Sequence, residues 1–264
     1  MLIGCSSDKK EQAPVNFGTE VYDSTALHVA LVPNKESLPI YYAQERGIFK
    51  RLGLNLQIAT YPTQLDCDTA LLGQSADGGI IDRIRLQSYA KRASHLTVLW
   101  KEYAPLQIFA CNSLRIKNIK NLYGRTIGIS RHSSDEQALM QALAKAHIDE
   151  GNVYRPQINN LKLRTEMLTG DQIDAAVLSW PYTSLARALE HNSIYTFKDS
   201  IANICFVQNK TKTDNDRIKQ QWTLFEKGRK MAIDSLKTFG SSSYALILQK
   251  EYGIPQEVAD TIKY

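Results

Sequence analysis

The sequence predicts an α/β fold of two lobes, because it contains one long internal repeat and a regular alternation of strands and helices. The segment LLGQSADGGIID at residues 71–82 reappears 97 residues later as LTGDQIDAAVLS at residues 168–179. Each copy is typical of a helix end, a Gly turn, an Asp and a short apolar strand, and we expect Gly73 and Gly170 to adopt positive φ. Solenoid units have only about 20 to 50 residues, so a repeat this long predicts two similar lobes instead.

The first unit alternates apolar strands with helices. The helix after the first strand is indicated by the spacing of Tyr42, Ala43, Ile48 and Phe49, and Gly53 turns the chain into the next strand. Alternation of this kind predicts a parallel sheet with right-handed crossovers. The expected elements are a strand at 27–33, a helix at 38–51, a strand at 54–60, a helix at 64–72, a strand at 78–81, a helix at 83–91 and a strand at 96–101.

The second unit has strands at 125–130, 152–157 and 175–179, and two apolar strands bracket it. The remaining chain, 215–263, is helical with breaks at Gly240 and at residues 253–255. Two bracketing strands predict a hinge, with both strands crossing between the lobes. The predicted parts are hinge strands at 106–112 and 201–208, a first lobe of residues 25–107 plus 205–264, and a second lobe of residues 113–200.

Paired hinge strands would bring Cys111 near Cys205. A disulfide between them is one hypothesis, and two buried free thiols are the alternative. The four cysteines form no metal-ligand spacing such as CxxC, so we expect neither a metal nor a cofactor.

Charge and hydropathy restrict the class of protein. The net charge is +5, but Lys and Arg are interleaved with Asp and Glu, which argues against nucleic-acid binding. No run approaches the roughly 18 to 20 apolar residues that cross a bilayer. We therefore expect a soluble, monomeric body.

The N-terminus suggests a membrane anchor. Residues 2–5, LIGC, resemble the lipobox of bacterial lipoproteins, in which the Cys carries lipid; a chance LxGC is the alternative. Only four residues precede Cys5, so we expect that the start is truncated or trimmed. Residues 6–23 have little apolar content and are typical of a flexible tether, which makes residues 1–24 lipobox and tether. This predicts a lipoprotein at the periplasmic face of a bacterial membrane.

Several motifs together resemble a known family. LPIYYAQERGIFKRLGLNL at residues 38–56 closely resembles the helix and strand of substrate-binding proteins for nitrate, sulfonate, taurine and thiamine-pyrimidine precursors. Residues 70–77, 122–129 and 168–182 resemble later motifs of that class. The resemblance covers residues 26–205 and implies a type II periplasmic-binding fold with two hinge-crossing strands, a ligand between the lobes, and an ABC permease as partner.

Ligands of open α/β sheets bind at the carboxyl ends of strands, where helix N-termini favour polar or anionic groups. This rule selects residues 33–37, 82–83, 130–134 and 179–182, with 61–63 as a weaker fifth segment. Asn34 and Ser37 have helix capping as the alternative role. The candidate ligand-binding residues are Asn34, Ser37, Tyr42, Asp82, Arg83, Ser130, Arg131, His132, Ser133, Ser179, Trp180 and Tyr182.

The loop at residues 130–134 is the richest in hydrogen-bond donors. Arg131 or His132 can pair with an anionic group. The alternative for Ser133 is a capping box with Glu136, which explains this serine without a ligand.

Aromatic residues offer a second kind of contact. Trp180 and Tyr182 can form a stacking wall for a flat ligand, or simply pack around Pro181. Tyr41 and Tyr42 point about 100° apart on their helix, so we expect only one of them to face the cleft.

No catalytic pattern competes with ligand binding. The five histidines are scattered, and the sequence has no nucleophile elbow or phosphate loop. The expected function is therefore a lipid-anchored, non-enzymatic solute-binding protein that captures a small polar or anionic organic molecule for an ABC importer. The alternatives are an enzyme of the same fold, either a menaquinone-pathway lyase or a pyrimidine-precursor synthase, and a ligand sensor without transport.

Overall fold

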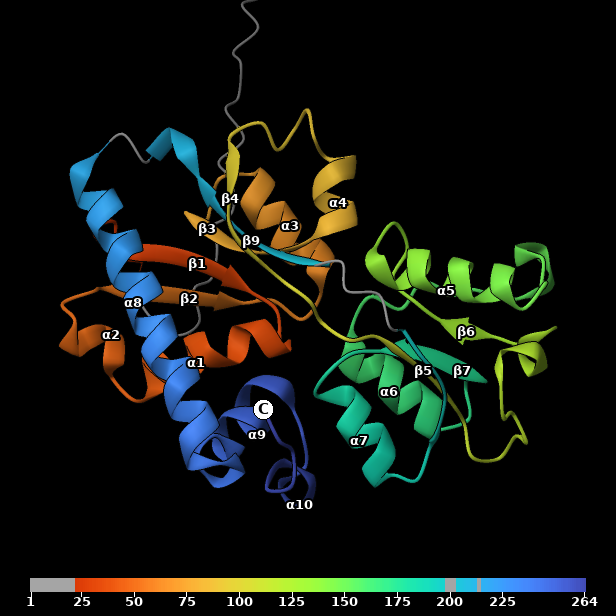
Figure 1. Ribbon diagram of the computed structural model, residues 1–264. Coiled ribbons are helices and arrows are strands. Elements are labelled where there is room, and N and C mark those ends of the chain that lie inside the picture. The colour runs from red at the N-terminus through yellow and green to blue at the C-terminus, as the bar shows by residue number, and fades with distance from the viewer. Residues whose placement is uncertain (1–21, 198–202, 213–214) are drawn as a thin grey trace, which may run out of the picture.

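A computed structural model describes residues 22–197, 203–212 and 215–264 (Figure 1). Two mixed sheets, each flanked by helices, form two lobes that lie side by side, which confirms the predicted two-lobed α/β fold. The predicted lipobox with Cys5, and the tether up to residue 21, lie outside the described residues. Among the described residues, no helix combines the length and apolar character needed to span a bilayer.

The first lobe is built on a sheet of order β2-β1-β3-β9-β4. Strands β1, β2 and β3 are parallel, whereas β9 runs antiparallel between β3 and β4. The predicted parallel sheet is thus only partly correct, because β9 returns from the second lobe into the middle of the first sheet. The strands are β1 (Leu27–Leu31), β2 (Leu56–Thr60), β3 (Gly78–Asp82), β4 (Leu96–Glu102) and β9 (Ile204–Asn209).

The second lobe contains a sheet of order β6-β7-β5-β8. Only β6 and β7 are parallel. The expected strand at 152–157 is reduced to two isolated bridges, and β8 was not expected from the sequence. The strands are β5 (Gln107–Ala110), β6 (Ile127–Gly128), β7 (Ala175–Leu178) and β8 (Asn192–Thr196).

Helices cover both sheets. The long helix α8 packs against α1 and α2 in the first lobe (Figure 1). The expected helix at 38–51 is two helices, since Gly47 has a φ of 62° and interrupts the hydrogen-bond ladder. The helices are α1 (Leu38–Glu45), α2 (Ile48–Arg51), α3 (Gln64–Leu72), α4 (Arg83–Ser88), α5 (Ser134–Lys145), α6 (Leu161–Thr169), α7 (Tyr182–Ala188), α8 (Asp216–Phe239), α9 (Ala245–Tyr252) and α10 (Gln256–Ala259).

The chain passes between the lobes at the starts of the two predicted hinge strands. Strand β5 pairs inside the second sheet and β9 inside the first, so the regular part of each strand belongs to one lobe. The chain leaves the first sheet after Glu102 and returns to it at Ile204. Asn203 joins the two connections: its side chain accepts the amide proton of Ala104 and donates to the Ala104 carbonyl.

Cys111 and Cys205 lie at different sheets, one in each lobe. The Cys111 amide binds the Asp174 carbonyl at the end of β5, whereas Cys205 lies opposite Ile81 in the first sheet. Both are buried free thiols, so the disulfide hypothesis is wrong and its alternative is confirmed.

The internal repeat has a structural counterpart, but the positive φ falls one residue later than expected. Gly73 and Gly170 have φ of −81° and −86°, and it is Gln74 and Asp171 that have φ of 59° and 54°. Each Gly instead avoids a backbone carbonyl: a Cβ on Gly73 would lie 2.9 Å from the Thr69 oxygen. The repeat therefore specifies the same helix-to-strand turn in both lobes.

Candidate functional site

A cavity of about 90 Å³ lies between the two lobes. Its walls come from strand ends and loops of both lobes and from the two interlobe connections. The polar residues that line it are Asn34, Glu36, Gln64, Asp82, Arg85, Ser130, Ser133, Ser134, Asp135, Asn159, Ser179, Tyr182 and Asn203; Val32, Pro33, Pro62, Leu65, Ala104, Leu106, Leu161 and Ile204 complete the wall.

Asp82 ends β3 at the rim of this cavity and links the two lobes. Its Oδ1 accepts the amide protons of Ile84 and Arg85, which caps α4. Its Oδ2 accepts the amide proton of Ser134, at 3.0 Å, from the first turn of α5 in the other lobe. Burial raises the pKa of Asp82, while these hydrogen bonds favour the carboxylate. One carboxylate thus occupies the N-termini of two helices.

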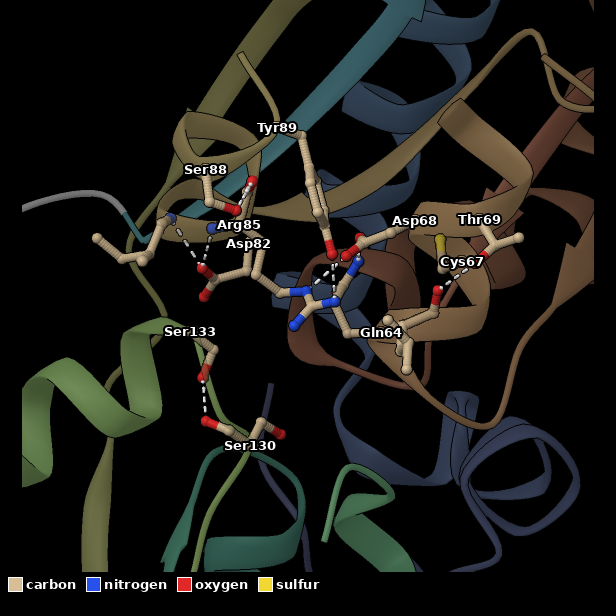
Figure 2. A network of polar contacts seen from close by, with 12 residues as sticks. Gln64, Cys67, Asp68, Thr69, Asp82, Arg85, Ser88, Tyr89, Ser130 and Ser133 are labelled. Atoms are coloured by element: carbon tan, nitrogen blue, oxygen red, sulfur yellow. Dashed lines mark hydrogen bonds and ion pairs between the residues drawn. The ribbon is translucent and has the colours of Figure 1, made fainter. Parts of the chain in front are cut away.

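Arg85 provides a second link across the cleft. Figure 2 shows its guanidinium between Asp68 and Tyr89, on the first-lobe side of the loop that carries Ser130 and Ser133. The Arg85 side chain also donates to the Arg131 carbonyl of the second lobe, at 3.2 Å. Burial raises the pKa of Asp68 to about 6, and the Arg85 charge opposes that rise. All three guanidinium nitrogens therefore have partners from the chain itself.

The cavity wall of the second lobe is stabilised by Arg164, which is fully buried behind it. Its guanidinium donates to Ser130 Oγ, to Asp135 and to the Val177 carbonyl. Ser133 Oγ donates to the Ser130 carbonyl at 2.7 Å (Figure 2). This buried cation fixes the position of the loop that faces the first lobe.

The expected capping box at α5 is only half formed. Ser133 caps the helix by accepting the Asp135 amide proton, but the Glu136 carboxylate accepts the amide proton of His132 instead of that of Ser133. His132 has a φ of 55°, which turns the loop so that its amide meets Glu136.

Glu36 is the lining carboxylate with a buried oxygen that has no partner among the described residues. It lies in the short 3-10 helix after β1, and only 6% of its surface is exposed. Among the described residues, its Oε2 has no hydrogen-bond partner. Burial raises the pKa of Glu36 to about 7. With this pKa, the carboxyl group of Glu36 can be neutral or ionised near pH 7, and the charge of a bound ligand decides between the two states.

The structure brings six of the predicted ligand-binding residues to the cavity wall. Several of them are already engaged: Asn34 Oδ1 accepts the Ser37 amide proton, and the Tyr182 hydroxyl donates to the Tyr252 carbonyl. These six are Asn34, Asp82, Ser130, Ser133, Ser179 and Tyr182.

The predicted cations of the site lie outside the cavity. Arg131 is exposed and donates to the Arg155 carbonyl, and His132 is exposed beside it. Arg83 points across the cleft rim, where it donates to Gln87 and Gln137. The loop therefore presents its serines, not its charges, to the cavity.

The other predicted residues away from the wall have structural contacts. Ser37 is fully buried, and the Tyr42 ring packs under the Arg46 guanidinium. Trp180 donates from Nε1 to the Lys263 carbonyl and packs against Tyr252.

Sequence reasoning missed seven polar lining residues: Glu36, Gln64, Arg85, Ser134, Asp135, Asn159 and Asn203. Arg85 and Gln64 lie within helices, so the strand-end rule did not select them. Asn203 precedes a strand, but β9 is antiparallel, so its start lies beside Asp82 at the end of β3. Glu36 lies inside the selected segment 33–37, next to Ser37. Its charge within a segment expected to line the cleft was the signal that could have identified it.

Replacing Asp82 with Ala should open the lobes. We expect a loss of about 1 kcal/mol from the α4 cap, together with loss of the link to Ser134. Small-angle scattering should show a larger radius of gyration for the ligand-free variant. Asp149→Ala removes the cap contact to Gly151 within the second lobe alone and is the matched control. An unchanged radius for Asp82→Ala would contradict the linking role.

Glu36 should make the ligand-free protein less stable as pH rises. Its pKa is about 7 when folded and 4.5 in the ordinary state, so neutral Glu36 favours folding fully below pH 4.5, and this contribution disappears as pH rises through 7. Lys35, Glu102, Tyr252 and Tyr264 face it.

Glu36→Gln should remove this contribution. Relative to wild type, the variant should gain about 2 to 3 kcal/mol in unfolding free energy between pH 5 and pH 8, measured by chemical denaturation. Glu257→Gln, at an exposed position, should follow wild type. Parallel pH curves for wild type and Glu36→Gln would contradict the assignment.

Comparison with solved structures places this cleft in a known fold. The aliphatic sulphonate binding protein of Escherichia coli is 17% identical, with a TM-score of 0.68, over 90% of this chain and 78% of that chain. The alkanesulfonate-binding protein of Xanthomonas axonopodis pv. citri, bound to MOPS, is 16% identical with a TM-score of 0.70, over 91% of this chain and 84% of that one. The ligand-binding component of an ABC-type import system from Staphylococcus aureus gives a TM-score of 0.71 at 13% identity, over 89% and 82%.

Sequence comparison identifies the family. No curated protein sequence gave a significant match. The family model described as NMT1/THI5 like matches residues 34–237, which is most of the chain and includes every candidate ligand-binding residue from Asn34 to Tyr182. The chain therefore belongs to the NMT1/THI5-like family and has the type II periplasmic-binding fold.

Proposed function

We propose that this protein is a solute-binding protein that captures a small polar organic molecule between its lobes and delivers it to an ABC permease. The observation that carries the proposal is the cavity whose walls are polar residues of both lobes. A ligand in this position touches both lobes at once, so its binding energy favours the closed arrangement over the open one. Three solved structures of this fold are described as binding proteins or import components, which supports the same role.

The connections between the lobes are suited to hinge motion. In the part of the chain that the structure describes, Asn203 lies beside the segment after β4 and binds it at Ala104. Polar contacts between the lobes include Asp82 to Ser134, Arg85 to the Arg131 carbonyl, and Tyr182 to the Tyr252 carbonyl. Trp180 adds an aromatic contact with Tyr252. When the lobes open, water can satisfy the polar groups of these contacts, which lowers the free-energy cost of opening.

The proposed location is the periplasmic face of a bacterial membrane, with lipid on Cys5 as the anchor. The LIGC motif and the polar segment behind it support this location, and the Escherichia coli neighbour is described as periplasmic.

Cys5→Ser should release the protein from the membrane. Without a thiol to acylate, the chain has no anchor, so fractionation of the producing bacteria should find the variant in the soluble fraction and wild type with membranes. Cys67→Ser changes a buried thiol and is the control. Membrane association of Cys5→Ser equal to wild type would contradict the anchor.

Ligand binding can be tested with a variant that fills the cavity. A thermal-shift panel of sulfonates, nitrate, bicarbonate, pyrimidines, aromatic acids and amines should contain a compound that stabilises wild type, by about 2.7 kcal/mol at 100 times its Kd. Asn159→Trp places an indole in the cavity and should abolish this stabilisation. Asn192→Trp, on an exposed strand, should retain it.

Two outcomes would overturn the proposal. If Asn159→Trp responded to the panel as wild type does, the ligand would bind elsewhere than in the cleft. If the stabilising compound were converted to a product on incubation with wild type, the protein would be an enzyme of this fold.

A further inference from the structure

The charges that line the cavity are all compensated except one. Asp135 pairs with the buried Arg164 at 2.7 Å, and Arg85 pairs with Asp68. Asp82 accepts three backbone amide protons. Among the lining carboxylates that the structure describes, only Glu36 has a fully buried oxygen without a hydrogen-bond partner.

Two groups that could receive an anion in the cleft are already engaged. A helix N-terminus is the usual anion site of this kind of fold, but at α5 the Asp82 carboxylate accepts the Ser134 amide proton. Arg85 is paired with Asp68 and also donates to Tyr89 and to the Arg131 carbonyl. An anion would meet three carboxylates, Glu36, Asp82 and Asp135, whereas the lining cation, Arg85, already has a carboxylate partner.

A buried carboxylate has two ways to become satisfied. It can bind a proton, which makes it neutral and gives it an O–H hydrogen-bond donor. Alternatively it can ionise and accept a hydrogen bond from a cationic ligand. A protonated Glu36 would suit an anionic ligand, but that ligand would still face Asp82 and Asp135. A cationic ligand satisfies Glu36 and is attracted by both other carboxylates.

We propose that the cleft binds a small molecule that carries a protonated amine or amidinium group, and that this group donates its N–H to Glu36 Oε2. This inference rests on the proposed solute-binding function and specifies its substrate class. The neutral polar groups of Ser130, Asn159 and Ser179 then face the rest of the ligand.

The test compares small organic cations with small organic anions. Acetamidinium and benzamidinium are compared with acetate and benzoate, and ethylammonium with ethanesulfonate and methylphosphonate, by calorimetry and thermal shift at pH 8. Cations should bind and anions should not. Glu36→Gln should weaken cation binding at least tenfold, as expected for a hydrogen bond to a charged group. Glu257→Gln, which changes an exposed carboxylate, should bind as wild type does.

A pH series separates a ligand contact from a purely structural role. Binding of a cation to wild type should tighten between pH 6 and pH 8, because its partner Glu36 ionises in this range, with a pKa of about 7. Lys35, Glu102, Tyr252 and Tyr264 also face Glu36, and burial raises the pKa of both tyrosines, which keeps them neutral throughout. Glu36→Gln should lose the pH dependence while retaining the wild-type circular dichroism spectrum.

The remaining outcomes are distinct. Binding of the anions instead of the cations, with equal affinity in wild type and Glu36→Gln, overturns the cation inference and leaves the solute-binding function intact. Binding of neither class, in both calorimetry and thermal shift, counts against the inference and the proposed function together.

Discussion

The arrangement of the two lobes depends on one carboxylate that is shared by two helices. Asp82 ends β3, caps α4 in its own lobe and accepts the first-turn amide of α5 in the other lobe. Helix N-termini carry unpaired N–H groups and partial positive charge, so a carboxylate placed between two of them satisfies both at once. The position of the cavity follows from this contact, because the loops on either side of it form the walls.

The same contact changes what the cleft can recognise. In a fold that offers helix N-termini to ligands, a carboxylate of the chain at α5 removes the strongest anion site. Arg85 and Arg164, the two buried cations nearest the cavity, are likewise committed to Asp68 and Asp135. Among the lining carboxylates described, the one with a buried unpartnered oxygen is Glu36, and the proposed positive charge of the ligand rests on this group.

The strand-end rule selected loops that contribute to the cavity wall but not all the residues that line it. Asn34, Asp82, Ser130, Ser133, Ser179 and Tyr182 lie on the cavity wall, as a rule based on parallel strands predicts. Arg131 was chosen for its charge, yet it turns outward to the Arg155 carbonyl. Local sequence does not encode the direction of side chains in an irregular loop. The position of this loop depends on Arg164, which is distant in the sequence and donates a hydrogen bond to Ser130 Oγ.

The sequence by itself determined the class of fold. Hydrophobic periodicity identifies individual strands and helices, and the repeat after 97 residues indicates that the same unit occurs once in each lobe. It also located helix ends to within a few residues in most of the first lobe. The tertiary structure alone decided the mixed sheet, the place of the hinge at Asn203, and the pairing of each charge. Those features depend on where β9 inserts and on which carboxylate meets which helix, and both involve contacts between residues distant in the chain.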